Sequence, residues 1–457
     1  MESGRLGGCR ADDPLSQYAR GMGILESVQI ASPKRKPGEK SDWYGYYAGY
    51  SANFTRDTLA AIVRPDDSST TRVLDPWNGS GTTTAIAAAQ GYEAIGLDRN
   101  PALVTIAKAR HLTVSSVKES LEPLLAEIVT VAKRLTRKVR DNAEKEELSL
   151  WFSDTSAARL RATERAMYRM FADKDSSGLL TEPVDPSLLS PLASFFYCTL
   201  FTAVRQLTAP FRTSNPTWIR GAGENTERLD VSWSRLNGLL EKACRDLAAR
   251  LTLPLSEDAT PYHLFEGSVE NLKLKRKADV VLTSPPYCTR IDYVVATKPE
   301  LVILGNDAWD LDRLRRQMLG SPLTKDSNLE VNQAWGASAV KFMDAVTSHH
   351  TKAAATYYRR YYLAYLQGLF KSLRMIDKAT KREGRIALVV QDSFFKEVHF
   401  DLPTMVSEMG RSIGRDSERM DFHVTRTKAA IHPGSRIYRT TFSATESLVV
   451  FGEKEDR

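Results

Sequence analysis

Short, unbroken apolar segments constrain the fold of this 457-residue chain more than any other feature. The clearest are 278–283 (ADVVLT), 385–390 (RIALVV) and 447–451 (SLVVF), and a shorter one lies at 72–74. A strand that is apolar on both sides of its pleat must be covered on both faces, as in a parallel sheet flanked by helices. The alternation of these strands with helical segments predicts an open, doubly wound α/β domain.

A long helical stretch interrupts the strand signals. Residues 112–261 show a 3.6-residue apolar period and no clear strand, which predicts a helical insertion between two parts of one domain, residues 41–111 and 262–457. Residues 1–40 are Gly-rich, charged and without apolar periodicity, and they end in a basic run (KRKPGEK). We therefore expect a flexible basic tail at 1–40.

Composition excludes several classes of protein. No run approaches the roughly 18 to 20 apolar residues of a membrane span, and the first thirty residues lack the pattern of a signal peptide, so we expect a cytoplasmic protein with no membrane partner. The 4 Cys and 7 His show no ligand spacing, so no metal site and no disulfide framework are predicted. The net charge of +7 is compatible with a nucleic-acid partner without establishing one.

The first motif lies at 73–84 (VLDPWNGSGTTT), where a strand meets a glycine turn and a helix. Gly79 and Gly81 let the backbone approach a ligand closely, and no Lys follows Gly81, so this is not a phosphate-binding P-loop. About twenty residues later a second strand ends in Asp98, where a carboxylate can accept hydrogen bonds from ribose hydroxyls, although Asp98 could instead cap the next helix. Asp75, a fixed anion at the start of the loop, disfavours a pyrophosphate and favours the cationic cofactor S-adenosylmethionine.

The second motif is Thr-Ser-Pro-Pro-Tyr at 283–287, at the end of a predicted strand. The two prolines fix φ and remove backbone donors, which leaves the Pro285 carbonyl as an acceptor beside Ser284. Tyr287 adds an aromatic face. Taken alone, the segment could equally be a Pro-Pro turn that closes a strand.

The two motifs together, Asp-Pro-x-x-Gly-Ser-Gly-Thr-Thr and Thr-Ser-Pro-Pro-Tyr, resemble the DNA methyltransferases that modify exocyclic amino groups. The resemblance covers about residues 43–110 and 262–451, and it implies a Rossmann-like methyltransferase fold whose mostly parallel sheet has an antiparallel edge. It also implies that S-adenosylmethionine lies over the first strand and the target base at the fourth. The implied cofactor-binding residues are Asp75, Pro76, Trp77, Asn78, Gly79, Ser80, Gly81, Thr82, Asp98, Arg99, Ser268, Thr283, Tyr47 and Ser51. The implied catalytic residues are Ser284, Pro285, Pro286 and Tyr287.

The chemistry explains these residue types. An exocyclic amino nitrogen is a poor nucleophile because its lone pair is delocalised into the ring. If Ser284 and the Pro285 carbonyl accept its N–H bonds, the lone pair is freed to attack the methyl group in line. The base must be extruded from the duplex, and Tyr287 can then stack on it. The residues that follow are expected to line the pocket mouth or contact DNA, namely Thr289, Arg290, Asp292 and Tyr293, with an Arg290–Asp292 ion pair as the alternative.

Serine before the two prolines favours, by resemblance, N4 of cytosine over N6 of adenine. Cys288 does not form a Pro-Cys dipeptide, which argues against C5-cytosine methylation. An RNA guanine-N2 methyltransferase and a catalytically silent DNA-binding subunit are more distant alternatives. The predicted partners are double-stranded DNA and, by family resemblance, a restriction endonuclease or other defence-system subunit. Target recognition is assigned to the insertion, including 214–220, or to 305–354.

Overall fold

The structure is a computed structural model of the chain, and it is described for the residue ranges that follow. These are 23–26, 28–34, 43–45, 49–64, 71–112, 118–141, 146–171, 183–213, 218–223, 227–251, 261–288, 291–321, 329–425 and 443–455.

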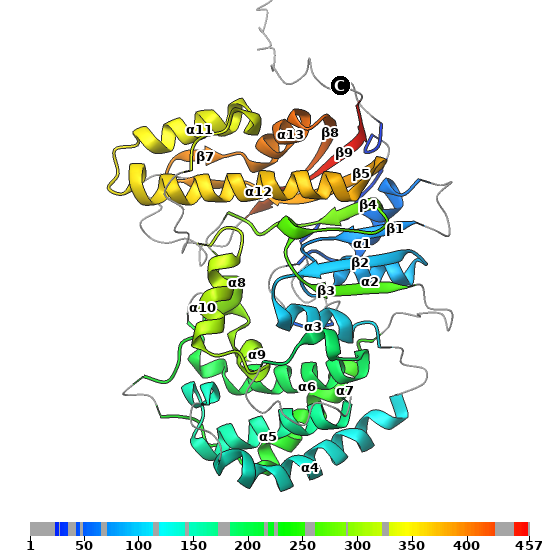
Figure 1. Ribbon diagram of the computed structural model, residues 1–457, viewed down its shortest axis with the longest axis vertical. Helices are drawn as coiled ribbons and strands as arrows, with labels where there is room; N and C mark the ends of the chain where they lie inside the picture. The colour runs from blue at the N-terminus through cyan, green and yellow to red at the C-terminus, as the bar shows by residue number, and fades with distance from the viewer. Residues whose placement is uncertain are drawn as a thin grey trace, which may run out of the picture.

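Helices and strands alternate at both ends of the described chain, and helices alone fill its middle (Figure 1). The α-helices are α1 (Ala52–Ile62), α2 (Thr82–Ala89), α3 (Pro101–Ala109), α4 (Leu121–Asp141), α5 (Asp154–Phe171), α6 (Pro191–Leu207), α7 (Trp233–Ala248), α8 (Tyr293–Ala296), α9 (Lys298–Ile303), α10 (Ala308–Gln317), α11 (Ala337–Ser348), α12 (Arg359–Ala379) and α13 (Leu402–Ser412). The strands are β1 (Arg72–Asp75), β2 (Glu93–Asp98), β3 (Tyr262–Glu266), β4 (Ala278–Thr283), β5 (Thr380–Gln391), β6 (Ser393–Phe395), β7 (Val398–Phe400), β8 (Arg415–Thr425) and β9 (Ser443–Lys454). Short helices are η1 (Lys118–Ser120), η2 (Glu147–Leu150), η3 (Pro186–Leu188), η4 (Ala209–Phe211), η5 (Val269–Asn271), η6 (Gln333–Trp335) and the π-helical η7 (Ala354–Tyr358).

Seven of the described strands form one sheet in the order β3-β2-β1-β4-β5-β9-β8. The first five are mutually parallel, whereas β9 runs antiparallel to β5 and β8 runs antiparallel to β9. The prediction of an α/β domain with a mostly parallel sheet and an antiparallel edge is therefore confirmed. The strand order reverses between β1 and β4, because β2 and β3 lie on one side of β1 and the later strands on the other. In sheets of this kind, ligands bind outside the carboxyl ends of the strands at such a switch point.

Both faces of the sheet are buried, as the unbroken apolar strands require. Val73 of β1 and Val280 of β4 point into a cluster with α1 and α2, whereas their neighbours Leu74 and Val281 point into a second cluster with α11, α12 and α13. Successive residues of a strand face opposite sides of a sheet, so the apolar residues of these runs pack against helices on one face or the other. Burial at roughly 25 cal/mol per Å² of apolar surface makes these two layers the main stabilising contribution of the domain.

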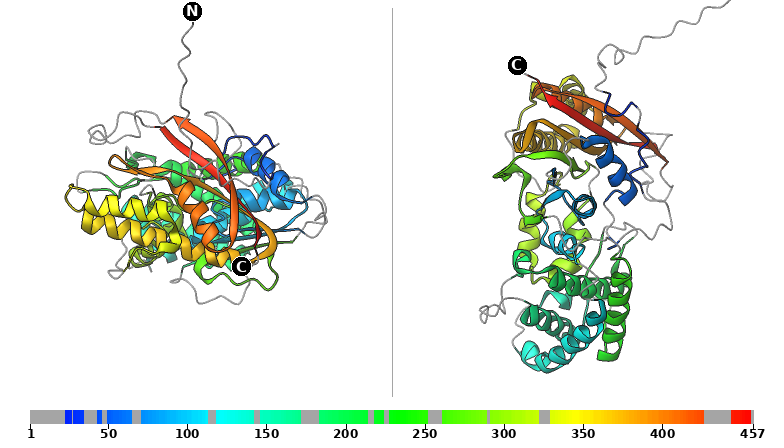
Figure 2. Two further views of the ribbon diagram at one scale, coloured as in Figure 1. Left: turned by 90° about the horizontal axis from the view of Figure 1, so that it is seen from above. Right: turned by 90° about the vertical axis from the view of Figure 1, so that its right-hand side faces the viewer.

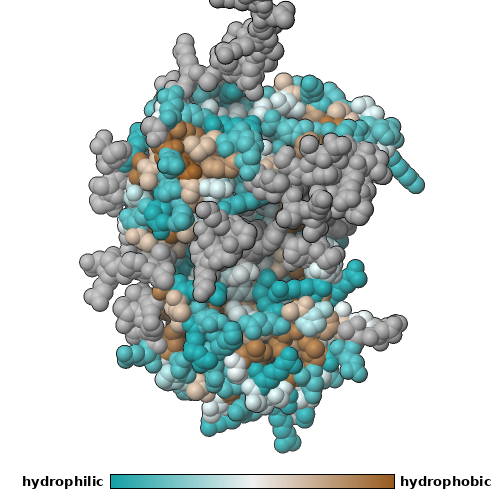
Figure 3. Space-filling view, turned by 180° about the vertical axis from the view of Figure 1, so that it is seen from behind, coloured by the Kyte–Doolittle hydropathy of each residue, from teal (hydrophilic) through white to brown (hydrophobic). Residues whose placement is uncertain are grey.

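The helices α4 to α7 lie within residues 112–261 and share a core of their own with α3 and α9. They lie at the opposite end of the molecule from β8 and β9, in both Figure 1 and the right panel of Figure 2. Arg161 of α5 ties them to the rest of the chain, because its guanidinium donates to the backbone oxygens of Val302 and Ile303 at 2.7 Å and pairs with Glu146 and Glu164. Seen from behind, the surface at this end is mostly hydrophilic, with apolar side chains exposed between polar ones (Figure 3).

The structure describes part of the expected flexible tail at residues 1–40, and there the chain contacts the rest of the fold. The backbone N–H groups of Ile24 and Leu25 donate to the Glu418 carboxylate of β8, at 3.2 and 2.8 Å, and Ala31 N–H donates to Asp57 of α1. Ile30 is buried in the core on the α1 side of the sheet. Residues 23–26 and 28–34 are thus a strap that lies against the antiparallel edge and α1.

Candidate functional site at the carboxyl ends of β1 and β4

The two predicted motifs meet at the switch point of the sheet. Asp75 is the last residue of β1 and Thr283 is the last residue of β4, and the Thr283 hydroxyl donates a 2.5 Å hydrogen bond to Asp75 Oδ1. The backbone N–H of Trp77 lies 3.2 Å from the same carboxylate oxygen and 3.3 Å from Thr283 Oγ1. This network holds the glycine loop after β1 beside the Ser-Pro-Pro-Tyr segment after β4.

Asp75 is 2% exposed. Besides Thr283 and Trp77, the Tyr50 hydroxyl lies 3.4 Å from Oδ2 and also hydrogen-bonds to Thr83. Burial raises the pKa of Asp75 from 3.8 to about 6, and the hydrogen bonds from Thr283 and Thr83 oppose that rise. The carboxylate therefore acts mainly as a buried, oriented negative charge behind the loop.

The glycine loop has the backbone conformation that its sequence predicts. Gly79 and Gly81 have φ of +52° and +79°, a region that side chains rarely allow. A Cβ on Gly81 would lie 2.7 Å from Ala107 Cβ of α3, so the loop also needs glycine for its close contact with that helix. The Asn78 side chain accepts a 3.0 Å hydrogen bond from Thr84, which fixes the turn onto the start of α2.

Asp98, at the end of β2, faces this loop. Its Oδ2 accepts the Gly79 N–H at 2.9 Å and its Oδ1 accepts the Asn100 N–H at 2.8 Å. Each carboxylate oxygen has a second lone pair, so acceptor capacity remains for hydroxyl donors. Burial raises the pKa of Asp98 from 3.8 to about 6, with the backbone hydrogen bonds opposing the rise. Asp98 is not the cap of α3, because Asn100 caps that helix through Ala102 N–H.

The outer predicted cofactor residues divide into two groups. The guanidinium of Arg99 hydrogen-bonds to Ser268, and Ser268 also caps η5 through Glu270 N–H, so these two residues form one side of the site near the end of β3. Phe265, the adjacent aromatic residue of β3, is 51% exposed. Ser51 instead caps α1 through Phe54 N–H at 3.2 Å, which is a structural role. Tyr47 lies outside the described residues.

The remaining loop residues are mostly buried. Pro76, Ser80 and Thr82 are buried, whereas Trp77 is partly exposed. Arg110, the residue that follows α3, donates to the Ser80 carbonyl at 3.2 Å and to the Thr82 hydroxyl at 3.1 Å. The far side of the loop is thus held by the end of α3.

The Ser-Pro-Pro-Tyr segment extends from β4 toward β9. The Tyr287 hydroxyl donates a 2.5 Å hydrogen bond to Glu446 Oε1, and the Ser284 hydroxyl hydrogen-bonds to the Tyr287 phenol. Burial, followed by the charge of Glu446, raises the pKa of Tyr287 well above its usual value. Pro285 is buried, and Ser284 is partly exposed at the open end of the strand.

Contacts with α12 and α8 hold the backbone of the Ser-Pro-Pro-Tyr segment in place. The Pro286 carbonyl accepts a 3.0 Å hydrogen bond from Tyr365 of α12, and the Tyr287 N–H donates to the Tyr293 hydroxyl at 3.2 Å. Cys288 is 5% exposed and contacts the Tyr361 hydroxyl, which leaves it in the core. Tyr361 and Tyr365 of α12 are also buried. Their rings therefore belong to the core and present no exposed face on which a base could stack.

The predicted DNA-contacting residues have mixed outcomes. Asp292 caps α8 through Val295 N–H and forms a 2.7 Å ion pair with Arg315, so both carboxylate oxygens have structural partners. Tyr293 positions the Tyr287 backbone, as described above. Thr289 and Arg290 lie outside the described residues.

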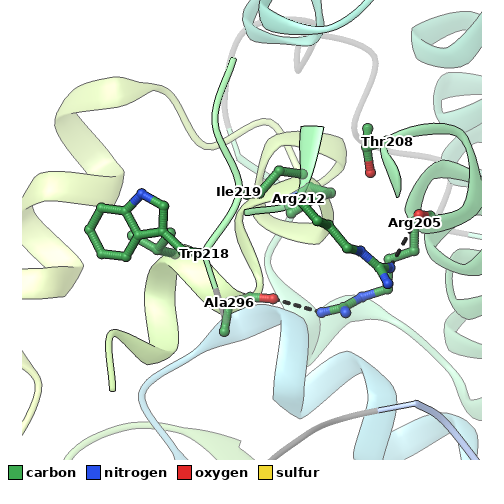
Figure 4. A pocket seen from close by; sticks show the side chains of 8 residues that line it. Arg205, Thr208, Arg212, Trp218, Ile219 and Ala296 are labelled. Atoms are coloured by element: carbon green, nitrogen blue, oxygen red, sulfur yellow. Dashed lines mark hydrogen bonds between the residues drawn. The ribbon is translucent and has the colours of Figure 1, made fainter. Parts of the chain in front are cut away.

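A shallow hollow lies where the insertion meets α8 and α9. Arg205, Arg212, Trp218 and Ala296 are among the residues that line it (Figure 4). Arg205 is committed to the buried Glu300 and to the Ala296 carbonyl at 2.7 Å, whereas Arg212 is exposed and Trp218 is 38% exposed. Residues 214–217, part of the predicted recognition segment, lie outside the described residues.

Two residues of the site were not predicted. Tyr50 lies in an aromatic segment that the sequence does mark, but nothing local indicates that this tyrosine reaches Asp75. Glu446 lies on β9 opposite Gln391, the last residue of β5, so the antiparallel direction of β9 brings it to the carboxyl end of the parallel strands. In the sequence, Glu446 is marked only by its position directly before the apolar run at 447–451, the last predicted strand.

No helix in the described ranges is long and apolar enough to cross a membrane, and no three metal-binding side chains gather there. Comparisons with protein-family models, with curated proteins and with solved structures found no match to this chain.

Proposed function

We propose that this protein transfers a methyl group from S-adenosylmethionine to the exocyclic amino group of a base flipped out of duplex DNA, with N4 of cytosine as the preferred target. The observation that carries the proposal is the hydrogen bond between Thr283 and Asp75. It joins the strand end that precedes the glycine loop to the strand end that precedes Ser-Pro-Pro-Tyr. The loop proposed to hold the cofactor and the segment proposed to hold the amino group are thereby adjacent at the switch point of the sheet, which supports the proposal.

The residues on the cofactor side fit S-adenosylmethionine. Asp98 is 9% exposed, receives only backbone N–H donors from the described residues and keeps acceptor capacity for ribose hydroxyls. Asp75 supplies a buried negative charge that favours a cationic group over a phosphate. The exposed ring of Phe265 and the paired Arg99 and Ser268 border the position expected for the adenine. When bound, S-adenosylmethionine supplies an electrophilic methyl group.

The protein groups on the acceptor side act on the amino group of the base. Ser284 and the Pro285 carbonyl accept its two N–H bonds, which draws the nitrogen toward a tetrahedral geometry and frees its lone pair. Tyr287, whose ring is fixed by Glu446 at one end and by Tyr293 at its backbone, offers a face for stacking. Because these acceptors are held by the strand end, the nitrogen is oriented before reaction, which lowers the entropic part of the barrier.

Cytosine N4 is preferred over adenine N6 because serine, and not Asp or Asn, precedes the two prolines. The same acceptor pair would serve an adenine amino group, so N6-adenine methylation is the alternative. A guanine-N2 methyltransferase of RNA is the more distant one. Exposed Arg212 and Trp218 on the insertion support a nucleic-acid partner at that end of the molecule. By resemblance we also propose a role in marking self DNA beside a nuclease or another defence-system subunit.

Transfer of labelled methyl from S-adenosylmethionine to a DNA library, followed by nucleoside mass spectrometry, tests the proposal. We expect N4-methylcytosine with the wild-type protein and none with Ser284→Ala plus Tyr287→Ala. N6-methyladenine would reverse the base preference and keep the mechanism. Labelled RNA with unlabelled DNA, or no labelled nucleoside with any nucleic acid tested, would contradict the proposed function.

A further inference from the structure

Glu446 is a buried carboxylate beside the proposed acceptor site. It is 6% exposed, and its Oε2 is buried without a hydrogen-bond partner among the described residues. Its other oxygen accepts the 2.5 Å hydrogen bond from the Tyr287 phenol. An ionised carboxylate with one oxygen unsatisfied is costly in a protein interior, and such a group is poised to take a proton.

The Tyr287 phenol interacts with both Ser284 and Glu446. It donates a hydrogen bond to Glu446, and Ser284 lowers the pKa of the phenol, which is the effect of a hydroxyl that donates to it. A hydroxyl can accept one hydrogen bond while it donates another. The three side chains can therefore pass a proton from the partly exposed Ser284 to a buried carboxylate.

The proposed reaction needs such a path. Methylation of an amino group must also remove one of its protons, and a serine hydroxyl is too weakly basic to keep that proton near neutral pH. Resting on the function proposed above, we propose that Glu446 is the terminal proton acceptor of the reaction and that the proton reaches it through Ser284 and Tyr287.

The step balances as follows. As the N–CH₃ bond forms and the carbon–sulfur bond of the methyl donor breaks, an N–H bond of the base breaks and its proton moves to Ser284 Oγ. The Ser284 hydroxyl proton moves to the Tyr287 oxygen, and the Tyr287 proton moves to Glu446 Oε1. The sulfonium charge and the carboxylate charge disappear together, which leaves a neutral thioether and a neutral carboxylic acid.

The groups that face Glu446 come from four directions. Tyr287 donates to it from the segment after β4, and the positive charge of Lys34 acts on it from the N-terminal strap. Its strand partners, Gln391 on β5 and Phe422 on β8, carry no charge. Burial raises the pKa of Glu446 above 4.5, whereas Tyr287 and Lys34 oppose the rise. The carboxylate is thus a stronger base than that of an ordinary exposed glutamate.

Single-turnover methyl transfer at saturating S-adenosylmethionine tests the relay across a pH series. Glu446→Gln keeps the side-chain shape and an acceptor for Tyr287 but cannot take the proton, and Tyr287→Phe keeps the ring but breaks the path. We expect each to lower the rate about 100-fold or more, with cofactor affinity within about twofold of wild type. The wild-type rate should fall as the pH drops through the pKa of Glu446, and Glu446→Gln should lack that fall. Glu446→Asp should restore part of the rate.

Glu453→Gln is the matched control, because its carboxylate lies on the same strand with its side chain 59% exposed. It should react like wild type. A wild-type rate and pH profile in Glu446→Gln or Tyr287→Phe would overturn the relay and leave the proposed function standing. If wild-type protein binds the cofactor but methylates no amino group of any nucleic acid tested, the proposed function fails and the relay fails with it.

Discussion

Thr283 donates a 2.5 Å hydrogen bond to Asp75 across 208 residues of sequence, and this contact joins the ends of β4 and β1 inside the sheet core. Thr283 is fully buried and Asp75 is nearly so. This hydrogen bond fixes the position of the glycine loop after β1 relative to the Ser-Pro-Pro-Tyr segment after β4. It has this effect whether or not either side chain contacts a substrate.

Replacement of Thr283 by Val should therefore destabilise the fold. The change keeps the β-branched shape but removes the hydroxyl, which leaves the buried Asp75 carboxylate with one donor fewer at a cost of about 1–3 kcal/mol. Thr283→Ser, which retains the hydroxyl, should cost less. Urea unfolding of both variants measures the difference, and equal stabilities would show that the hydrogen bond contributes little.

Gly81 should tolerate alanine less well than Gly91. Both glycines have positive φ, +79° and +82°, so an alanine costs roughly 1–2 kcal/mol of backbone strain at either position. At Gly81 the new Cβ would also meet Ala107, whereas at Gly91 it meets nothing within 4 Å. We expect Gly81→Ala to add about 1–3 kcal/mol of overpacking and to weaken cofactor binding at least about tenfold. Calorimetry that finds the two variants alike would contradict this.

Cofactor affinity should fall in acid. The pKa values of Asp75 and Asp98 are both raised by burial to about 6, so each carboxylate takes up a proton as the pH drops below about 6. Because the proposed cofactor interacts with the ionised forms, its dissociation constant should rise by up to about tenfold per carboxylate for each pH unit below 6. Titration calorimetry between about pH 5 and 8 measures this dependence.

The same shifts predict the opposite trend for the stability of the cofactor-free protein. The folded pKa exceeds the unfolded value of 3.8, so the folded state holds these protons more tightly, and this contribution to stability is lost as the pH rises from about 4 to about 6. Asp98→Asn should remove the contribution of Asp98 to the pH dependence of cofactor affinity and to the pH dependence of stability. Cofactor affinity that is equal at both ends of the pH series would argue against ionised carboxylates in the site.

Arg212 and Trp218 should contribute to DNA affinity through the hollow beside α8. Arg212→Ala should weaken binding uniformly across sequences and reduce the salt slope by about 1, because it removes one cationic contact. Trp218→Ala should weaken binding by about 1–3 kcal/mol if a base stacks on its ring. Fluorescence anisotropy at several salt concentrations measures both effects. Lys242→Ala, which alters an exposed i,i+4 pair on α7, is the control. Unchanged affinity in both test variants would remove this surface from the DNA interface.

The buried strands were predictable because their signal is local. Residues 278–283 show this apolar run and form β4 with those bounds. The edge strand β3 has no such run, since Leu264 is its one buried residue, and the edge strand β8 is polar along much of its length. Edge strands bury one face or less, so their sequences lack the pattern that marks central strands.

The missed contacts all depend on pairings that are distant in sequence. The strap at residues 23–26 and 28–34 is held by Glu418 and Asp57, which no local pattern connects to it. Glu446 belongs to the site because β9 inserts between β5 and β8. Motifs located the loops after β1 and β4, whereas the groups that reach those loops from other elements required the three-dimensional structure.

The position of β9 also determines when the site becomes complete during synthesis. β9 is the last described strand in the chain, yet it lies between β5 and β8, both of which emerge from the ribosome before it. Until β9 inserts, β8 has no strand to pair with and Tyr287 has no carboxylate to donate to. A nascent chain can thus form the glycine loop after β1 early, but under the relay proposed above it acquires its proton acceptor only when β9 is in place.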